Sequence, residues 1–160
     1  MARTIVFLDF DGPIATEQSY ARAYPHGKLI SKVEPEKFID EVLVKRVEDL
    51  CAGAEAHIVL STSWALMQGS EWCSDMLYSK GITKGRVIGA TPRRMSNYFR
   101  GNEIDWWLEN NRDVSSEDYV ILDDDTNFHP YQLGRLLVTP FNLGITEDQV
   151  KEAITMLRGQ

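Results

Sequence analysis

Short apolar runs alternate with amphipathic stretches along this chain. The apolar runs have the length of strands and are rich in branched side chains, and they cover residues 4–10, 56–61, 86–89, 119–123 and 136–139. Helical spacing of apolar residues or helix-end signals mark residues 35–51, 69–79, 101–110 and 146–157. Strands that alternate with helices predict an α/β fold, namely a three-layer, Rossmann-like parallel sheet with right-handed crossovers.

For two of the predicted helices, the sequence also indicates where the helix begins and which residues form its apolar face. The first begins at residue 34 or 35, and its apolar face should hold Phe38, Ile39, Val42, Leu43 and Val47. The last begins at a capping box formed by Thr146 and Gln149, and its apolar face should hold Val150, Ile154 and Leu157. Both faces are expected to be buried.

The chain is long enough for one compact domain and too short for two. It has 160 residues, of which 43% are hydrophobic and 26% are charged, so we expect a single domain over residues 1–160. Residues 12–34 fit neither the strand period nor the helix period. They are long enough for a short flap beside the first strand but not for a cap domain, and a plain surface excursion is the alternative.

Polar side chains follow three of the predicted strands at the point where each strand ends. Asp9 and Asp11 close the first strand, Ser61 closes the second, and Asp123 and Asp124 close the fourth. The carboxyl ends of parallel strands meet at one edge of an open sheet, which is where ligands bind. Adjacent carboxylates repel unless a cation or a shared proton offsets them, so a magnesium site is the simplest explanation. Solvated turns and helix N-caps are the alternatives for each fragment taken alone.

The order of these fragments resembles the haloacid dehalogenase (HAD) superfamily of magnesium-dependent phosphatases and phosphotransferases. Residues 9–12 resemble its first motif, Ser61 its second, and Asp123 with Asp124 its fourth. The resemblance implies a HAD-like fold that is nearly capless, with residues 12–34 as the flap insert.

The third motif of the superfamily is a lone Lys or Arg at a helix start, and it is the least specific of the four. Arg100 fits because it immediately precedes a predicted helix, and Arg93 and Arg94 are its rivals.

Within the superfamily, the chain is most similar to small, nearly capless HAD domains associated with RNA-repair proteins and with stand-alone bacterial or phage proteins. The segments that carry this similarity are residues 61–64, 89–92, 100–107 and 120–125. Two positions depart from the pattern: Pro13 stands where Thr or Val is usual, and Ala65 stands where Arg is expected. Pro13 should stiffen the turn, and Ala65 should remove a contact with phosphate or substrate.

The resemblance implies a phosphatase that works through an aspartyl-phosphate, with Mg²⁺ as its cofactor. Asp9 would be the nucleophile, and Asp11 would be the acid and then the base. Ser61 and Arg100 would hold the phosphoryl oxygens. The magnesium ligands would be the side chain of Asp9, the backbone carbonyl of Asp11, and Asp123, Asp124 or both.

The chain is acidic, with 24 acidic and 17 basic residues and a net charge of −7, which opposes broad attraction to nucleic acid or to an anionic membrane. One stretch concentrates positive charge, and it contains Lys84, Arg86, Arg93, Arg94 and Arg100. It predicts either a local anion-binding edge or an ordinary solvated loop. The resemblance implies an open site for a phosphorylated substrate, such as a nucleic-acid end or a nucleotide, and a small metabolite is the alternative.

The remaining signals concern location and cysteine chemistry. No apolar run approaches the length of a membrane span, and the first residues lead directly into a strand rather than a secretory leader. We therefore expect a cytoplasmic protein without a membrane partner, whereas the oligomeric state stays open. Cys51 and Cys73 lack zinc spacing and are expected to be buried free thiols.

Two other classes of protein compete with the phosphatase interpretation. A catalytically silent HAD-fold domain could bind phosphate or metal as a regulatory module, and magnesium-dependent turnover would distinguish it from an enzyme. A receiver-like signalling domain also phosphorylates an Asp, but that Asp would be expected on a middle strand. Here the middle strand ends in Ser61 and Thr62, and the acidic cluster comes late in the chain.

Overall fold

The computed structural model describes residues 2–24, 34–92 and 99–159. Strands alternate with helices along these residues, as the sequence pattern predicts. The elements are β1 (Thr4–Leu8), α1 (Glu17–Ala23), η2 (Pro35–Phe38), α2 (Glu41–Ala54), β2 (Ala56–Leu60), α3 (Ser63–Gln68), α4 (Ser70–Ser79), β3 (Val87–Ala90), α5 (Arg100–Glu109), β4 (Tyr119–Asp123), α6 (Pro130–Leu133), β5 (Leu136–Val138) and α7 (Glu147–Arg158).

The strands of the described residues form one parallel sheet in the order β3-β2-β1-β4-β5. β1 is central and pairs with β2 on one side and with β4 on the other. Its side chains from Ile5 to Leu8 are fully buried, as expected for a strand covered on both faces. The strand order reverses between β1 and β4, and an open sheet has its ligand crevice at the carboxyl ends of such a pair. The predicted α/β architecture is confirmed.

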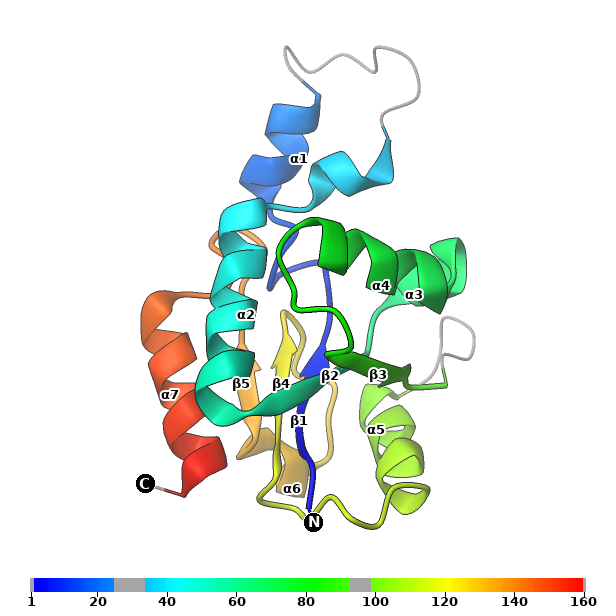
Figure 1. Ribbon diagram of the computed structural model, residues 1–160, viewed down its shortest axis with the longest axis vertical. Helices are drawn as coiled ribbons and strands as arrows, with labels where there is room; N and C mark the ends of the chain where they lie inside the picture. The colour runs from blue at the N-terminus through cyan, green and yellow to red at the C-terminus, as the bar shows by residue number, and fades with distance from the viewer. Residues whose placement is uncertain (1, 25–33, 93–98, 160) are drawn as a thin grey trace.

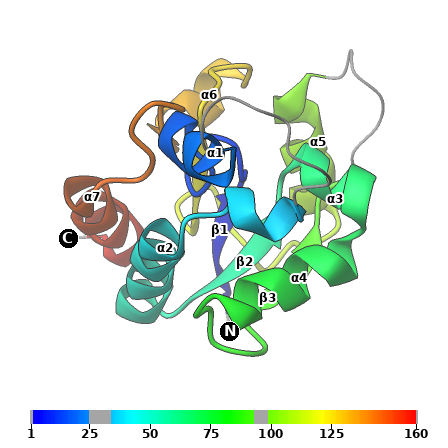
Figure 2. The ribbon, with the colours of Figure 1, turned by 90° about the horizontal axis from the view of Figure 1, so that it is seen from above.

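Helices cover both faces of the sheet and give three layers (Figures 1 and 2). One face packs on α2, α4 and α7 through a core that contains Val6 and Val47. The other face packs on α5, where Ile104 and Trp107 meet Phe7, and the Phe7 and Trp107 rings lie edge to face with their centroids 5.5 Å apart. The two cores hold β1 from both sides, so the residues that follow it have a rigid base.

The prediction of one continuous helix from residue 34 or 35 to residue 51 is wrong in its first part. Pro35–Phe38 form a 3-10 turn, and α2 begins afresh at Glu41. The Asp40 side chain caps α2 by accepting a hydrogen bond of 2.9 Å from the backbone N–H of Val42. The new start changes the helix face, because Val42 is 62% exposed; the buried residues are Leu43, Val44, Val47, Leu50, Cys51 and Ala54.

Three short helices, α1, α3 and α6, occupy segments where the sequence pattern predicts no helix. α1 lies inside the insert of residues 12–34 and starts at a capping box formed by Thr16 and Ser19. α3 starts at Thr62, whose hydroxyl accepts a hydrogen bond of 3.2 Å from the Trp64 N–H. Each helix is too short to display a hydrophobic period, so its cap was the only local signal.

The last helix and the cysteines agree with the sequence predictions. Thr146 and Gln149 form the capping box of α7, and Val150 is buried, with Ile154 and Leu157 packed partly against the same core. Cys51 and Cys73 are buried free thiols. Among the described residues, no helix combines the length and the apolar character needed to cross a membrane.

Candidate active site

Three carboxylates gather where β1 and β4 end. Asp9 follows β1, Asp123 is the last residue of β4, and Asp124 comes next. One oxygen of each carboxylate lies within 4.8 Å of the others. Asp9 and Asp123 are buried, whereas Asp124 is exposed. The fold thus brings together the acidic residues that the sequence places at separate strand ends, while their chemical roles stay predictions.

Burial perturbs the acidity of the two inner carboxylates. Burial is the largest cause that raises the pKa of Asp9 well above its usual range; the charge of Asp123 raises this pKa further, and Arg100 lowers it. Burial also raises the pKa of Asp123 to about 7, against the lowering effect of Arg100. A nearby cation favours the charged form of a carboxylate, so positive charge at this cluster opposes the effect of burial.

Arg100 supplies that positive charge from the first residue of α5. Its Nη1 lies 3.2 Å from Asp9 Oδ2 and donates a hydrogen bond to Asp123 Oδ2. The same nitrogen donates to the backbone carbonyl of Ser61 at 3.4 Å. One guanidinium therefore touches the ends of β1, β2 and β4. Arg100 thus lies among the carboxylates, whereas its rivals Arg93 and Arg94 lie outside the described residues.

Ser61 continues the ladder between β1 and β2 by one residue. Its backbone N–H donates to the carbonyl of Leu8 at 2.8 Å, which holds it beside the start of the Asp9 turn. The side chain of the next residue, Thr62, caps α3. The N-cap interpretation is therefore correct for Thr62, whereas the backbone carbonyl of Ser61 accepts the hydrogen bond from Arg100.

Gly12 allows the chain to turn sharply between Asp11 and the insert. Its φ of 105° lies in the region that favours glycine. A Cβ at this position would approach the backbone oxygen of Thr139 to 2.5 Å and the Cβ of Asp124 to 2.6 Å. The loops after β1, β4 and β5 are therefore packed tightly together around Gly12.

Replacing Gly12 by Ala should destabilise the protein by about 2–4 kcal/mol, because both the backbone conformation and the contact with Thr139 oppose a side chain. Denaturant unfolding followed by circular dichroism would measure the loss. Gly134→Ala is the matched control: Gly134 has φ −69° and open space around it, so the change should stay below about 1 kcal/mol. Equal effects of the two substitutions would contradict this interpretation.

Asp11 points its carboxylate toward two aromatic donors rather than into the carboxylate cluster. The Tyr20 hydroxyl donates to Oδ1 at 2.9 Å, and the Trp64 indole Nε1–H donates to Oδ2 at 3.1 Å. Sequence reasoning did not assign either donor to the site. Trp64 belongs to the segment that carries the family resemblance, whereas Tyr20 lies in the aperiodic insert, and nothing in the sequence pairs it with Asp11.

The three clustered carboxylates fit a magnesium ion chemically. They are hard oxygen donors from two adjacent strand ends, and their mutual repulsion in a buried setting requires a compensating cation. A magnesium ion usually keeps several water ligands, so three protein oxygens suffice. Asp9, Asp123 and Asp124 are therefore the side chains that could hold the metal.

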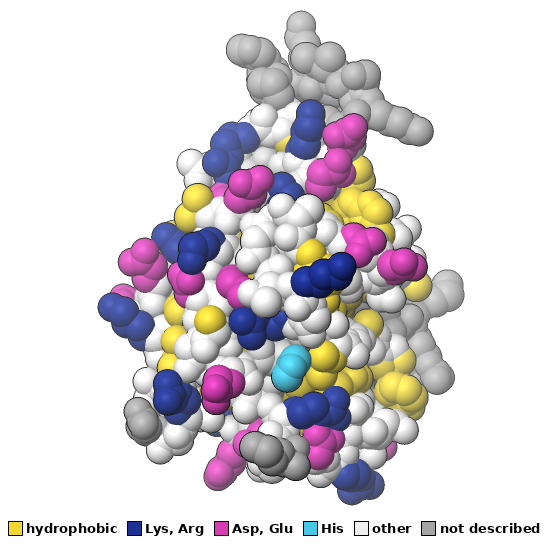
Figure 3. Space-filling model, in the orientation of Figure 1, with side chains coloured by type: hydrophobic (Ala, Val, Ile, Leu, Met, Phe, Trp, Pro, Cys, Tyr) yellow, Lys and Arg dark blue, Asp and Glu magenta, His cyan; other side chains and the backbone are white. Residues whose placement is uncertain are grey.

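Arg86 and Arg100, two described members of the basic stretch of residues 84–100, do not lie at the same end of the sheet. Arg86 precedes β3 and is paired with Glu48 at 3.0 Å, whereas Arg100 stands among the carboxyl ends of the strands. The two arginines thus lie at opposite ends of the strands. On the face seen in Figure 3, basic and acidic side chains of the described residues are interspersed, as expected for an ordinary solvated surface.

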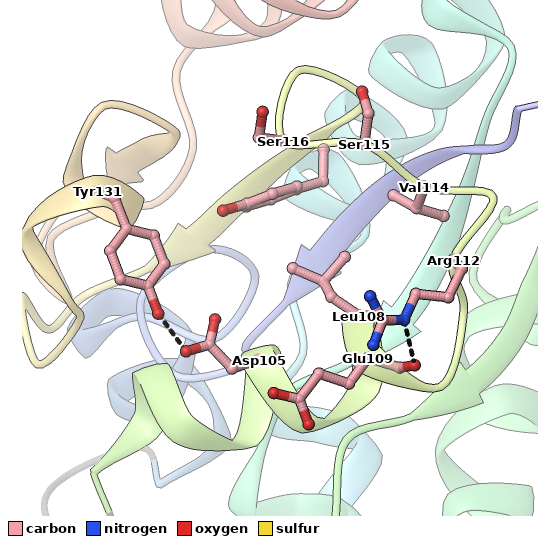
Figure 4. A pocket seen from close by; sticks show the side chains of 9 residues that line it. Asp105, Leu108, Glu109, Arg112, Val114, Ser115, Ser116 and Tyr131 are labelled. Atoms are coloured by element: carbon pink, nitrogen blue, oxygen red, sulfur yellow. Dashed lines mark hydrogen bonds between the residues drawn. The ribbon is translucent and has the colours of Figure 1, made fainter.

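A separate hollow of about 450 Å³ lies beside the amino end of β4, away from Asp123 at its carboxyl end. α5, the segment after it, and α6 contribute its lining (Figure 4). Tyr131 donates a hydrogen bond to Asp105 there, and Arg112 Nε donates to the carbonyl of Glu109 at 3.0 Å. These polar groups already have partners, and none of the four sequence motifs contributes to the lining.

Comparison with known proteins supports the resemblance seen in the motifs. The family model for the HAD domain in Swiss Army Knife RNA repair proteins matches residues 5–150. None of the curated proteins matches the chain. The matched region contains the carboxylate cluster, Ser61 and Arg100.

Proposed function

The chain belongs to the family of HAD domains in Swiss Army Knife RNA repair proteins, and from this premise we propose that it is a magnesium-dependent phosphatase that forms an aspartyl-phosphate on Asp9. The family implies hydrolase activity on phosphate esters in general. The observation that carries the finer proposal is the contact of Arg100 with Asp9, Asp123 and Ser61 at the ends of three strands.

In the first half of the proposed reaction, a carboxylate oxygen of Asp9 attacks the phosphorus atom. The bond from phosphorus to the ester oxygen breaks, and Asp11 gives its proton to that leaving oxygen. Arg100 and Ser61 hold the phosphoryl oxygens while negative charge spreads over them in the transition state.

In the second half, water attacks the phosphorus of the aspartyl-phosphate. Asp11, now unprotonated, takes a proton from that water, and the Asp9 carboxylate and inorganic phosphate are released. The first half needs Asp9 in its charged form, which its burial disfavours and which Arg100 favours, and the second half restores that form.

Asp9, Asp123 and Asp124, with the backbone carbonyl of Asp11, would hold Mg²⁺. The bound ion would supply positive charge that offsets both the carboxylates and the substrate phosphate. Arg100 already supplies part of the positive charge that the cluster requires, because it contacts two of the three carboxylates.

The proposed substrate is a phosphate monoester at the end of a nucleic acid or on a nucleotide. The insert of residues 12–34 contributes α1 in its described part, and η2 directly follows the insert; both lie above the carboxyl ends of the strands (Figure 1). The exposed Asp124 marks a side of the cluster that solvent reaches. An open site of this kind suits a phosphate carried on a large molecule. The matching family is named for HAD domains in RNA repair proteins, which agrees with a nucleic-acid substrate.

A substrate panel with and without Mg²⁺ tests the proposal. It should contain terminally phosphorylated RNA and DNA, nucleoside monophosphates, sugar phosphates and phosphopeptides, with Asp9→Asn as the control for contaminating phosphatases. Magnesium-dependent release of phosphate from the nucleic-acid ends is the expected result. Absence of Asp9-dependent turnover on every substrate would favour the catalytically silent binding module instead.

Asp124→Ala should raise the Mg²⁺ concentration needed for half-maximal activity by about tenfold, because it removes one metal ligand. Thermal stability without metal should change little, since Asp124 is exposed and its loss relieves repulsion at the cluster. Activity titrations with Mg²⁺, together with unfolding scans in a chelator, would measure both effects. An unchanged magnesium requirement in both Asp123→Ala and Asp124→Ala would move the metal site elsewhere.

A further inference from the structure

The carboxylate of Asp11 lies between two hydrogen-bond donors that come from different parts of the chain. Tyr20, on α1, donates its hydroxyl to one oxygen at 2.9 Å, and Trp64, on α3, donates its indole N–H to the other at 3.1 Å. Each oxygen of the carboxylate thus has its own donor. Two such bonds fix both the direction and the plane of the group.

Both donors are themselves held by aromatic packing. The Tyr20 ring stacks on Phe38 with centroids 4.3 Å apart, and the Trp64 ring meets the same Phe38 at 6.4 Å. Trp64 is buried and also contacts Phe10 and Trp72. Phe38 therefore links the two donors, and rings that are packed in this way cannot easily follow a displaced carboxylate.

We propose that Tyr20 and Trp64 are positioning residues that hold Asp11 in the orientation needed for proton transfer to the leaving oxygen; this inference rests on the proposed phosphatase function. An indole N–H can only donate, whereas a tyrosine hydroxyl can donate or accept. Trp64 consequently anchors one oxygen, and Tyr20 can stay bonded to the other before and after Asp11 transfers its proton. Neither donor needs to touch the substrate.

Substrates with different leaving groups distinguish a positioning role of Tyr20 and Trp64 from a purely structural role. Protonation by an acid matters greatly for an alkyl phosphate, whose alkoxide is a poor leaving group, and little for an activated aryl phosphate. A misplaced Asp11 should therefore slow the alkyl substrate selectively. General damage to the site would slow both substrates by the same factor.

Tyr20→Phe is the primary test, because it removes the hydroxyl and keeps the ring that stacks on Phe38. We expect kcat/KM for an alkyl phosphate to fall about tenfold and that for an aryl phosphate to fall less than about twofold. Trp64→Phe should show the same selectivity. Tyr24→Phe is the matched control, since Tyr24 also packs on Phe38 and has no assigned role at Asp11; it should leave both rates unchanged.

The outcomes separate this inference from the proposed function. If the unmodified protein has Asp9-dependent activity but Tyr20→Phe leaves the ratio of alkyl to aryl rates unchanged, the positioning role is wrong and the phosphatase proposal stands. If the unmodified protein shows no Asp9-dependent activity, the phosphatase proposal fails, and with it any positioning role.

A second measurement tests the contact itself without turnover. The indole N–H resonance of Trp64, assigned by its loss in Trp64→Phe, should shift and exchange faster with solvent in Asp11→Ala, because the acceptor is gone. An unchanged resonance would show that Trp64 does not hold Asp11, and would overturn the inference whatever the turnover of Trp64→Phe.

Discussion

Replacing Asp9 by Asn should lower the turnover of an aryl phosphate at least about a thousandfold, because the amide cannot act as the nucleophile. The fold should survive the substitution. Asn has nearly the same shape as Asp, and it removes a buried charge that Asp123 disfavours. Steady-state rates at saturating Mg²⁺, with circular dichroism of both proteins, would measure the two quantities.

Asp125→Asn is the matched control for this experiment. It makes the same change of side chain two residues beyond the buried Asp123, on an exposed residue that lies outside the carboxylate cluster. Its turnover should stay within about twofold of the unmodified protein. Similar rates in Asp9→Asn and the unmodified protein would exclude the covalent mechanism, whatever the control shows.

The sheet and its reactive edge could be predicted because they depend on strong local signals. A parallel strand buried on both faces reads as a continuous apolar run, and β4 occupies residues 119–123 as predicted. The polar residues that follow such runs must then meet at one edge of the sheet. Asp9, Ser61 and Asp123 could be brought together by this argument alone.

Helix boundaries were less predictable because a single cap can override an apolar period. Phe38, Ile39, Val42 and Leu43 have helical spacing, yet the Asp40 side chain begins α2 anew and leaves Val42 exposed. The Asp40 cap contributes about 1 kcal/mol to a helix start at Glu41, and the apolar spacing alone does not reveal this start.

Side-chain contacts that depend on loops and short helices could not be predicted. The hydrogen bond from Trp64 to Asp11 joins residues 53 positions apart. It depends on the short helix α3, which no hydrophobic periodicity in the sequence predicts. Arg86 and Arg100 look like one basic stretch in the sequence, but β3 begins directly after the first, and the second reaches the carboxyl ends of the strands. Residues that are close in the sequence can therefore lie on different surfaces when a strand separates them.

Arg100→Ala should lower turnover about a hundredfold or more for small and large substrates alike, because Arg100 is proposed to bind the transferred phosphoryl group itself. The loss should also reduce metal-free stability by about 3 kcal/mol, since the guanidinium compensates the buried Asp9 and Asp123. Added Mg²⁺ should therefore stabilise this variant more than the unmodified protein. Denaturant unfolding with and without the metal would measure the difference.

Arg100→Lys serves as the matched variant for charge. Lys keeps the positive charge but lacks the guanidinium group, whose Nη1 contacts Asp9, Asp123 and the Ser61 carbonyl. It should recover most of the lost stability and only part of the lost turnover. Equal turnover and equal stability in the Lys and Ala variants would mean that positive charge alone contributes nothing at this position.

The double substitution Arg93→Ala and Arg94→Ala completes the test of the third motif. These residues lie outside the described part of the chain, and we expect them only to attract a larger anionic substrate. Their loss should weaken action on a phosphorylated oligonucleotide, flatten its salt dependence and leave aryl phosphate hydrolysis nearly unchanged. If the double variant instead abolishes turnover of the small substrate while Arg100→Ala is mild, one of that pair binds the phosphoryl group. If every variant changes the turnover of the oligonucleotide and of the small substrate by the same factor, a nucleotide or metabolite phosphatase becomes the better assignment.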